Sequence, residues 1–192
     1  QSSGLLGALP IHALQAFLVW IGLSFKEAQL VDFIFWFTLP GLTMYFFAYK
    51  LWPEKKYLPL TASLVYMINF YLLQAWFVAE QTKFSIYAAL PIVAYFTIFY
   101  FTKKLSLLKS VLGTGITLGI LNGGGSFPLY GGLLIFFGIA TLYFNFFERN
   151  ISTNLRTIYY FVGVGVLFVL LSAYWLFSYI YYVLGFYSRD LA

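Results

Sequence analysis

The sequence predicts an all-α integral membrane protein with about six transmembrane helices and an N-terminal amphipathic helix on the outer face. Of its 192 residues, 62% are hydrophobic and only 9% are charged, whereas a soluble domain carries about 25% charge. The mean hydropathy of +0.86 excludes a disordered chain. Apolar runs long enough to cross a bilayer alternate with short polar breaks.

Six apolar stretches carry the prediction of membrane spans. They cover residues 28–48, 57–78, 84–101, 106–121, 127–147 and 157–187. The fourth is short and rich in glycine, whereas the sixth is long enough that it must tilt, kink or project beyond the bilayer. We therefore expect residues 28–192 to form one six-span domain.

Residues 1–27 are expected to form an outer-face loop with an interfacial helix. Pro10, His12 and Gln15 interrupt the apolar stretch 5–23, and the pattern over 10–23 is that of a short helix. Such a length is more typical of a surface segment than of a span. A seventh span is the alternative.

Lysine and arginine gather in alternate connections of the predicted bundle. Eight of the 11 cations follow the first, third and fifth spans, namely Lys50, Lys55, Lys56, Lys103, Lys104, Lys109, Arg149 and Arg156. Cytoplasmic loops are enriched in these residues, so these connections are predicted to be cytoplasmic and both ends of the chain to lie outside the plasma membrane. The net charge of +5 then reflects topology, and no nucleic-acid partner is expected.

The residue types that are absent exclude several chemistries. The chain has no cysteine and one histidine, which removes thiolate metal sites, thiol nucleophiles and bis-histidine haem. The run 122–126 lacks the Lys and Ser/Thr of a phosphate-binding loop, so a turn is predicted there. Gly115 and Gly119 are spaced for close helix packing. The pair Tyr159–Tyr160 is typical of an interfacial belt, and lining a groove for an isoprenoid or stacking on a sugar is the alternative.

Three side chains at the predicted outer edge are candidates for chemistry, because ionisable groups in membrane helices are rare and often functional. Asp32 lies near the start of the first span, where a helix N-terminal acid is the structural alternative. Glu80 is a metal ligand or an orienter of a phosphorylated substrate, or else a solvated partner of Lys83. His12 binds a phosphate or a sugar hydroxyl, or is merely tolerated. No metal site is assigned, and a divalent metal cofactor remains open.

Several features occur along the chain in a particular order. An outer-face stretch at 10–23 comes first, followed by short apolar motifs at 42–47 and 62–70. Glu80 in a short outer loop and two further motifs, at 87–92 and 171–176, come after them. This order resembles the GT-C superfamily of polytopic membrane glycosyltransferases, in particular its arabinofuranosyltransferase-like and related prokaryotic members. The resemblance covers most of the chain.

The resemblance implies transfer of a sugar from a polyprenyl-phosphate carrier to an acceptor on the outer face. It also implies a catalytic loop acid upstream of Gln1, and hence that the chain is part of a longer protein. Glu80 would lie in the second outer loop, although a single Glu without a paired Asp departs from the family pattern, and Asp32 matches no family motif. The implied partners are the lipid bilayer, a lipid-linked sugar, and the rest of the chain or other membrane subunits.

Two other functions fit the composition. A transporter or flippase would show paired charges or broken helices near the bilayer midplane, where the sequence offers only Asn69, Gln74 and hydroxyl groups. A structural subunit of a membrane complex is the third reading.

Overall fold

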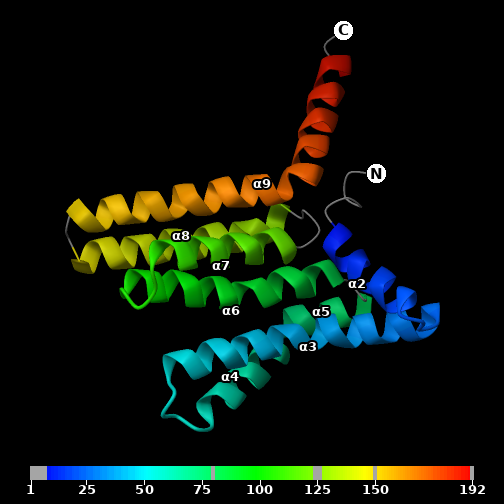
Figure 1. The fold of residues 1–192 in the computed structure, drawn as a ribbon, viewed down its shortest axis with the longest axis horizontal. Coiled ribbons are helices and arrows are strands. Elements are labelled where there is room, and N and C mark those ends of the chain that lie inside the picture. Colours follow the sequence, from blue (N-terminus) through cyan, green and yellow to red (C-terminus); the bar gives the residue numbers. More distant parts are fainter. Residues whose placement is uncertain (1–7, 79–80, 123–126, 149–150, 191–192) are drawn as a thin grey trace.

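The computed structural model describes residues 8–78, 81–122, 127–148 and 151–190, which form eight helices and contain no strand. Figure 1 shows most of them stacked side by side as a bundle, with α2 lying across one end. The helices are α2 (Leu9–Trp20), α3 (Phe25–Leu51), α4 (Leu58–Met67), α5 (Phe70–Val78), α6 (Gln81–Phe101), α7 (Leu107–Ile120), α8 (Phe127–Glu148) and α9 (Ile151–Asp190).

Three of these helices are long and apolar enough to cross a bilayer, namely α3, α6 and the segment Leu155–Ser178 of α9. Shorter apolar helices occupy the positions of the other predicted spans. Large hydrophobic side chains also cover much of the outer surface of the bundle. A soluble protein would bury such surface, so the chain is an all-helical membrane protein.

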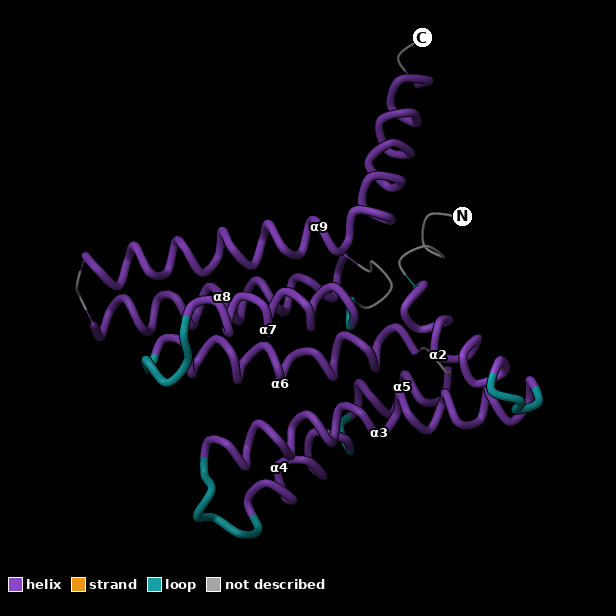
Figure 2. The backbone as a smooth tube through the Cα atoms, in the orientation of Figure 1, coloured by secondary structure: helices purple, strands orange, loops and turns teal. Residues whose placement is uncertain are grey.

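The second predicted span is not one continuous helix. Figure 2 shows a short loop between α4 and α5, where Ile68 and Asn69 separate the two helices. The stretch 57–78, predicted as a span, is thus divided into two helices. The physical reason for the division is the Asn69 side chain, whose oxygen accepts the backbone N–H of Leu72 at 3.0 Å and thereby starts a new helix.

The long helix α3 begins with a capping box. The Ser24 hydroxyl accepts the backbone N–H of Glu27, while the Glu27 carboxylate accepts the backbone N–H of Ser24 at 2.9 Å. This start lies three residues before the predicted one at 28. Ahead of it, α2 buries Ile11 and Leu18 and exposes Phe17 and Trp20.

The core is centred on α6, which buries eleven residues. A hydroxyl network joins it to two neighbours, because the Tyr160 hydroxyl of α9 lies 2.8 Å from both Thr97 of α6 and Thr114 of α7.

Close packing of α7 on α9 is confirmed at the predicted glycines. A Cβ at Gly115 would lie 2.5 Å from Leu167, and one at Gly119 would lie 2.8 Å from Leu171.

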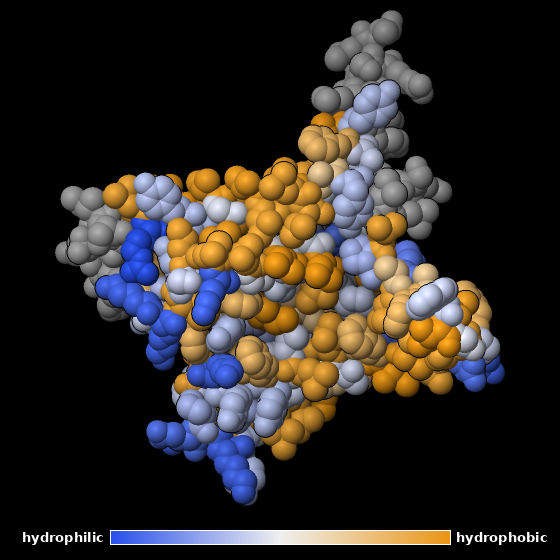
Figure 3. Space-filling view, viewed as in Figure 1, coloured by the Kyte–Doolittle hydropathy of each residue, from blue (hydrophilic) through white to orange (hydrophobic). Residues whose placement is uncertain are grey.

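The polar connections gather at one end of the bundle. The α3–α4 loop, the α6–α7 turn, the end of α8 and the start of α9 lie together at the left of Figure 1. Figure 3 shows hydrophilic side chains at that end and an apolar surface along the middle of this face. The C-terminal part of α9 bends away from the bundle at the opposite end.

Candidate functional site: a buried carboxylate and a lateral groove

Asp32 is a buried carboxylate that joins two of the membrane-crossing helices. Its exposed fraction is 1%. One carboxylate oxygen accepts the indole N–H of Trp36, one turn further along α3, at 2.9 Å. The other accepts the side-chain amide of Gln81, at the start of α6, at 2.6 Å. Both oxygens are thus held by N–H donors, which compensate part of the cost of burying the group.

The structure places two of the three predicted site residues on neighbouring helices, with Asp32 buried on α3 and His12 exposed on α2. Glu80, the third candidate, lies outside the described residues. Gln81 was missed by reasoning from sequence, because its role depends on a contact with a residue 49 positions away. Trp36 was missed as well, although its spacing of four residues from Asp32 places both side chains on one face of a helix.

The surroundings of the Asp32 carboxylate favour hydrogen bonding over metal binding. Within the described part of the chain, no group of three or more His, Asp or Glu side chains is arranged to hold a metal ion. A carboxylate can accept about four hydrogen bonds, and two are used.

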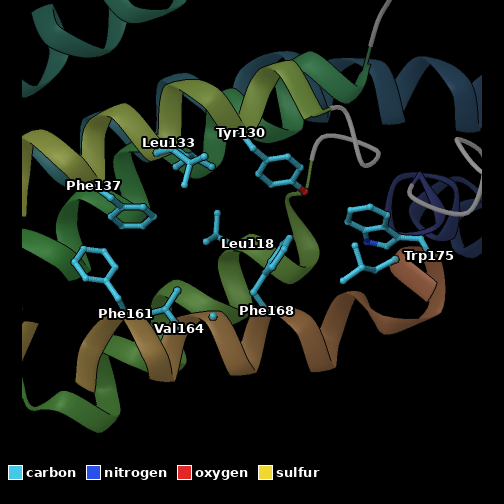
Figure 4. A pocket seen from close by; sticks show the side chains of 11 residues that line it. Leu118, Tyr130, Leu133, Phe137, Phe161, Val164, Phe168 and Trp175 are labelled. Atoms are coloured by element: carbon cyan, nitrogen blue, oxygen red, sulfur yellow. The ribbon is translucent and has the colours of Figure 1, made fainter. Parts of the chain in front are cut away.

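A second feature is an apolar groove of about 380 Å³ between α8 and α9, which we call the α8–α9 groove. Figure 4 shows side chains from both helices converging on it over Leu118 of α7. Its lining comprises Leu118, Tyr130, Leu133, Leu134, Phe137, Phe161, Val164, Gly165, Phe168, Trp175 and Leu176.

Two aromatic pairs bridge α8 and α9 across this groove. The rings of Tyr130 and Phe168 lie 5.7 Å apart, and those of Phe137 and Phe161 lie 5.3 Å apart, both edge to face. Gly165 lies between Phe161 and Phe168 in sequence, and a Cβ added there would meet no described atom within 4 Å. The space between the pairs is therefore open for a hydrocarbon chain.

Polar groups lie beside one end of the α8–α9 groove, whose own lining is apolar apart from the Tyr130 hydroxyl and the Trp175 indole N–H. The Tyr130 hydroxyl donates to the backbone carbonyl of Asn122 at 2.6 Å. The buried Asn122 amide in turn donates to the Tyr174 hydroxyl at 3.3 Å. These groups follow the end of α7, which lies at the same end of the bundle as the start of α6 (Figure 1). The Asp32 carboxylate and the Tyr130 end of the groove thus share one end of the molecule.

A third feature is the break between α4 and α5. The Asn69 amide donates to the backbone carbonyl of Tyr66 and to the Tyr87 hydroxyl. The rings of Tyr66 and Tyr87 stack at 4.3 Å, and Tyr71 stacks on Tyr87 at 5.6 Å. The polarity of Asn69 in an apolar run was the visible signal in the sequence, whereas its partners on α6 were not visible there.

Comparisons of the chain with protein-family models, with curated proteins and with solved structures find no match. The fold and the site define the class as an all-helical membrane protein with a lateral apolar groove. The function is therefore argued from the geometry.

Proposed function

We propose that this chain is part of a membrane glycosyltransferase of the GT-C type, which takes a sugar from a polyprenyl-phosphate carrier. The observation that carries the proposal is the α8–α9 groove, because it is an apolar groove lined by aromatic rings, and the polar groups of Asn122 and Tyr174 lie beside its Tyr130 end. Part of an isoprenoid chain fits this groove, and the phosphate and sugar would extend beyond its Tyr130 end. The nearby Asp32 cluster supplies a second polar surface at the same end.

The topology of such an enzyme would comprise six crossing segments, with α4 and α5 together forming the second. The cation-bearing α3–α4 and α6–α7 connections lie at one end of the bundle (Figure 1), which supports their placement in the cytoplasm. The Asp32 cluster and the Tyr130 end of the groove would then face outside, with α2 lying on the outer membrane surface. Exposed Phe17 and Trp20 on α2 are side chains that favour such an interface.

The chemistry would be direct transfer between two oxygens. An acceptor hydroxyl gives its proton to a carboxylate base and forms a bond to the anomeric carbon. The bond from that carbon to the carrier phosphate breaks, and polyprenyl phosphate leaves. The resemblance assigns the base to a loop upstream of Gln1. Asp32, which is buried under α2 and held by two donors, would act as a positioning residue for Gln81.

The groove is tested with a polyprenyl phosphate carrying a photoreactive diazirine in its chain. The full chain is reconstituted in vesicles with the probe, irradiated, and mapped by peptide mass spectrometry. Labelling is expected at groove residues such as Phe137, Val164 and Phe168. Gly165→Leu fills the groove without meeting a described atom at Cβ, so it should reduce this labelling about tenfold, which corresponds to about 1.4 kcal/mol of lost binding free energy.

Gly138→Leu is the matched control, since Gly138 on α8 is also open at Cβ and lines neither groove. It should be labelled like the wild type. Full labelling of Gly165→Leu would remove the groove as a carrier site.

Catalysis is tested separately, by transfer of a radiolabelled sugar from its lipid-linked form in membranes. Glu80→Gln should lower that transfer, and undiminished transfer would remove Glu80 from the catalytic machinery.

A lipid flippase or transporter is the second candidate, and the break between α4 and α5 favours it. Discontinuous helices are typical of transport proteins, where the freed backbone groups line the path of a substrate. Translocation of a fluorescent lipid across proteoliposomes, read by quenching from outside, tests this reading. Rapid translocation without sugar transfer would replace the glycosyltransferase proposal.

A further inference from the structure

The helix α8 is held to the bundle by few protein contacts. Among its described side chains, only Leu133 and Ala140 are buried. In contrast, α6 buries eleven residues. The side of α8 away from the bundle exposes Ile135, Ile139 and Leu142 by 62–72%. The other contacts of α8 with the bundle are made by half-buried rings such as Phe136 and Phe144, and space is left beside them.

The space left beside α8 is a second cavity of about 300 Å³, on the side of α8 that faces α6. We call it the α6–α8 groove. It is lined by Met44 and Phe47 of α3, Tyr66 of α4, Leu90, Pro91 and Ala94 of α6, and Gly132 and Phe136 of α8. Two membrane-crossing helices, α3 and α6, contribute to its walls, so the groove lies at membrane depth.

The lining of this groove selects against polar ligands. It contains no charged side chain. Its one hydroxyl, that of Tyr66, donates to the backbone carbonyl of Tyr87 at 2.8 Å. A sugar, nucleotide or peptide would leave its polar groups unpaired there, which is costly in an apolar site. A saturated or unsaturated hydrocarbon chain loses nothing.

The size of the groove also suits a chain. Its volume of about 300 Å³ is about twice that of an engineered 150 Å³ cavity that binds benzene. Gly132 forms part of the wall, and a Cβ added there would meet no described atom within 4 Å. The absence of a side chain at this position thus keeps the groove open.

We propose that the α6–α8 groove binds the acyl chain of a bilayer phospholipid, which fills the space between α6 and α8. The lining offers no donor or cation for a phosphate, so the groove selects on the chain alone, and acyl chains are the commonest chains in a bilayer. The α8–α9 groove differs in its surroundings, because the polar side chains of Asn122 and Tyr174 lie beside its Tyr130 end. The acyl-chain site does not depend on the proposed function.

The experiment uses the full chain in vesicles of a phosphatidylglycerol that carries a diazirine in its acyl chain. After irradiation, peptide mass spectrometry maps the labelled residues. Labelling is expected at Leu90, Ala94 and Phe136. Gly132→Leu fills the groove and should lower this labelling about tenfold, whereas Gly138→Leu, on the same helix and equally open, should be labelled like the wild type.

Unchanged labelling of these residues in Gly132→Leu would overturn the site. So would preferential labelling of the same residues by the polyprenyl phosphate probe, which would assign the groove to the carrier. A folding defect in Gly132→Leu is recognised by gel filtration in detergent and by the loss of helical circular dichroism relative to the wild type. If Gly132→Leu does not fold, Phe136→Trp is used as a second variant that fills the groove, with the same expected loss of labelling at Leu90 and Ala94. Gly132→Leu tests the acyl-chain probe in the α6–α8 groove, and Gly165→Leu tests the polyprenyl phosphate probe in the α8–α9 groove. Either site can therefore fail while the other is retained.

Discussion

The side-chain amide of Gln81 lies 2.6 Å from the carboxylate of Asp32, across 49 residues of sequence. This bond joins the first turn of α6 to α3 at the end of the bundle where α2 crosses. Because the carboxylate is buried and Trp36 also donates to it, the three side chains form one hydrogen-bonded unit. Loss of the acceptor would leave two N–H donors without their partner.

Asp32→Ala should therefore destabilise the protein by about 1–3 kcal/mol, the usual cost of leaving a buried polar group unsatisfied. Asp32→Asn should cost less, because an Asn oxygen still accepts from Trp36 and the Gln81 amide can turn to present its oxygen. Unfolding in mixed detergent micelles measures both free energies. Thr38→Ala, also on α3, is the control, since its hydroxyl donates only to carbonyls of its own helix. Equal stability of Asp32→Ala and wild type would contradict this role.

The Tyr160 network allows each hydrogen to be assigned. The Thr97 hydroxyl donates to the Val93 carbonyl at 2.7 Å, so it accepts from Tyr160. Tyr160 has then used its only hydrogen, and Thr114 must donate to it. Tyr160→Phe removes the centre of this chain and should cost about 0.6 kcal/mol, up to about 1.7, the range for interhelical hydrogen bonds in membranes.

A double-mutant cycle of Tyr160→Phe with Thr97→Val measures the coupling between these two residues. The stability loss of the double variant should be smaller than the sum of the two single losses, because each removes the same bond. Strictly additive losses would show that the 2.8 Å contact contributes nothing.

Alanine substitutions at the two glycines of α7 are expected to destabilise the protein to different extents. At Gly119, an added methyl group would meet Leu171 at its Cβ, which is fixed to the backbone. At Gly115, it would meet the end of the Leu167 side chain, which can change rotamer. Gly119→Ala should thus be the more destabilising, by about 1–3 kcal/mol. Gly138→Ala has open space and should be neutral or gain about 0.5–1 kcal/mol in helix propensity.

The same unfolding measurement ranks the three variants. A Gly115→Ala variant less stable than Gly119→Ala would show that Leu167 cannot move aside. A destabilised Gly138→Ala would show that this face of α8 is covered.

The fold class could be predicted because composition alone determines it, and local signals fixed several details. The helix-packing role of Gly115 and Gly119 is confirmed, since small residues at that spacing leave a flat helix face. The start of α3 was predicted three residues too late, although Ser24 and Glu27, a capping pair three residues apart, are a local signal for it. Such features depend on neighbours within one or two turns.

Features that depend on distant contacts could not be predicted. Tyr160 was interpreted as an interfacial belt residue, and this is wrong, because its side chain is fully buried between partners 63 and 46 residues away. Gln81 looked like a loop residue until α3 placed Asp32 beside it. The α8–α9 groove likewise arises from the spacing of two helices, which no stretch of sequence records.

Asn69 is the residue on which the break between α4 and α5 depends. Its oxygen caps α5 at the backbone N–H of Leu72, and its amide reaches the Tyr87 hydroxyl at 3.0 Å. Loss of such a cap typically costs about 1 kcal/mol. Asn69→Ala should therefore lower the free energy of local opening, and amide hydrogen exchange over residues 70–78 should quicken about fivefold.

Gln74→Ala is the matched control, since Gln74 is exposed on the same helix, and its exchange should equal that of the wild type. Tyr87→Phe keeps the ring stack and removes only the hydroxyl, so its effect should be smaller than that of Asn69→Ala. Exchange in Asn69→Ala that is unchanged or slower would contradict the capping role of the Asn69 side chain at the start of α5.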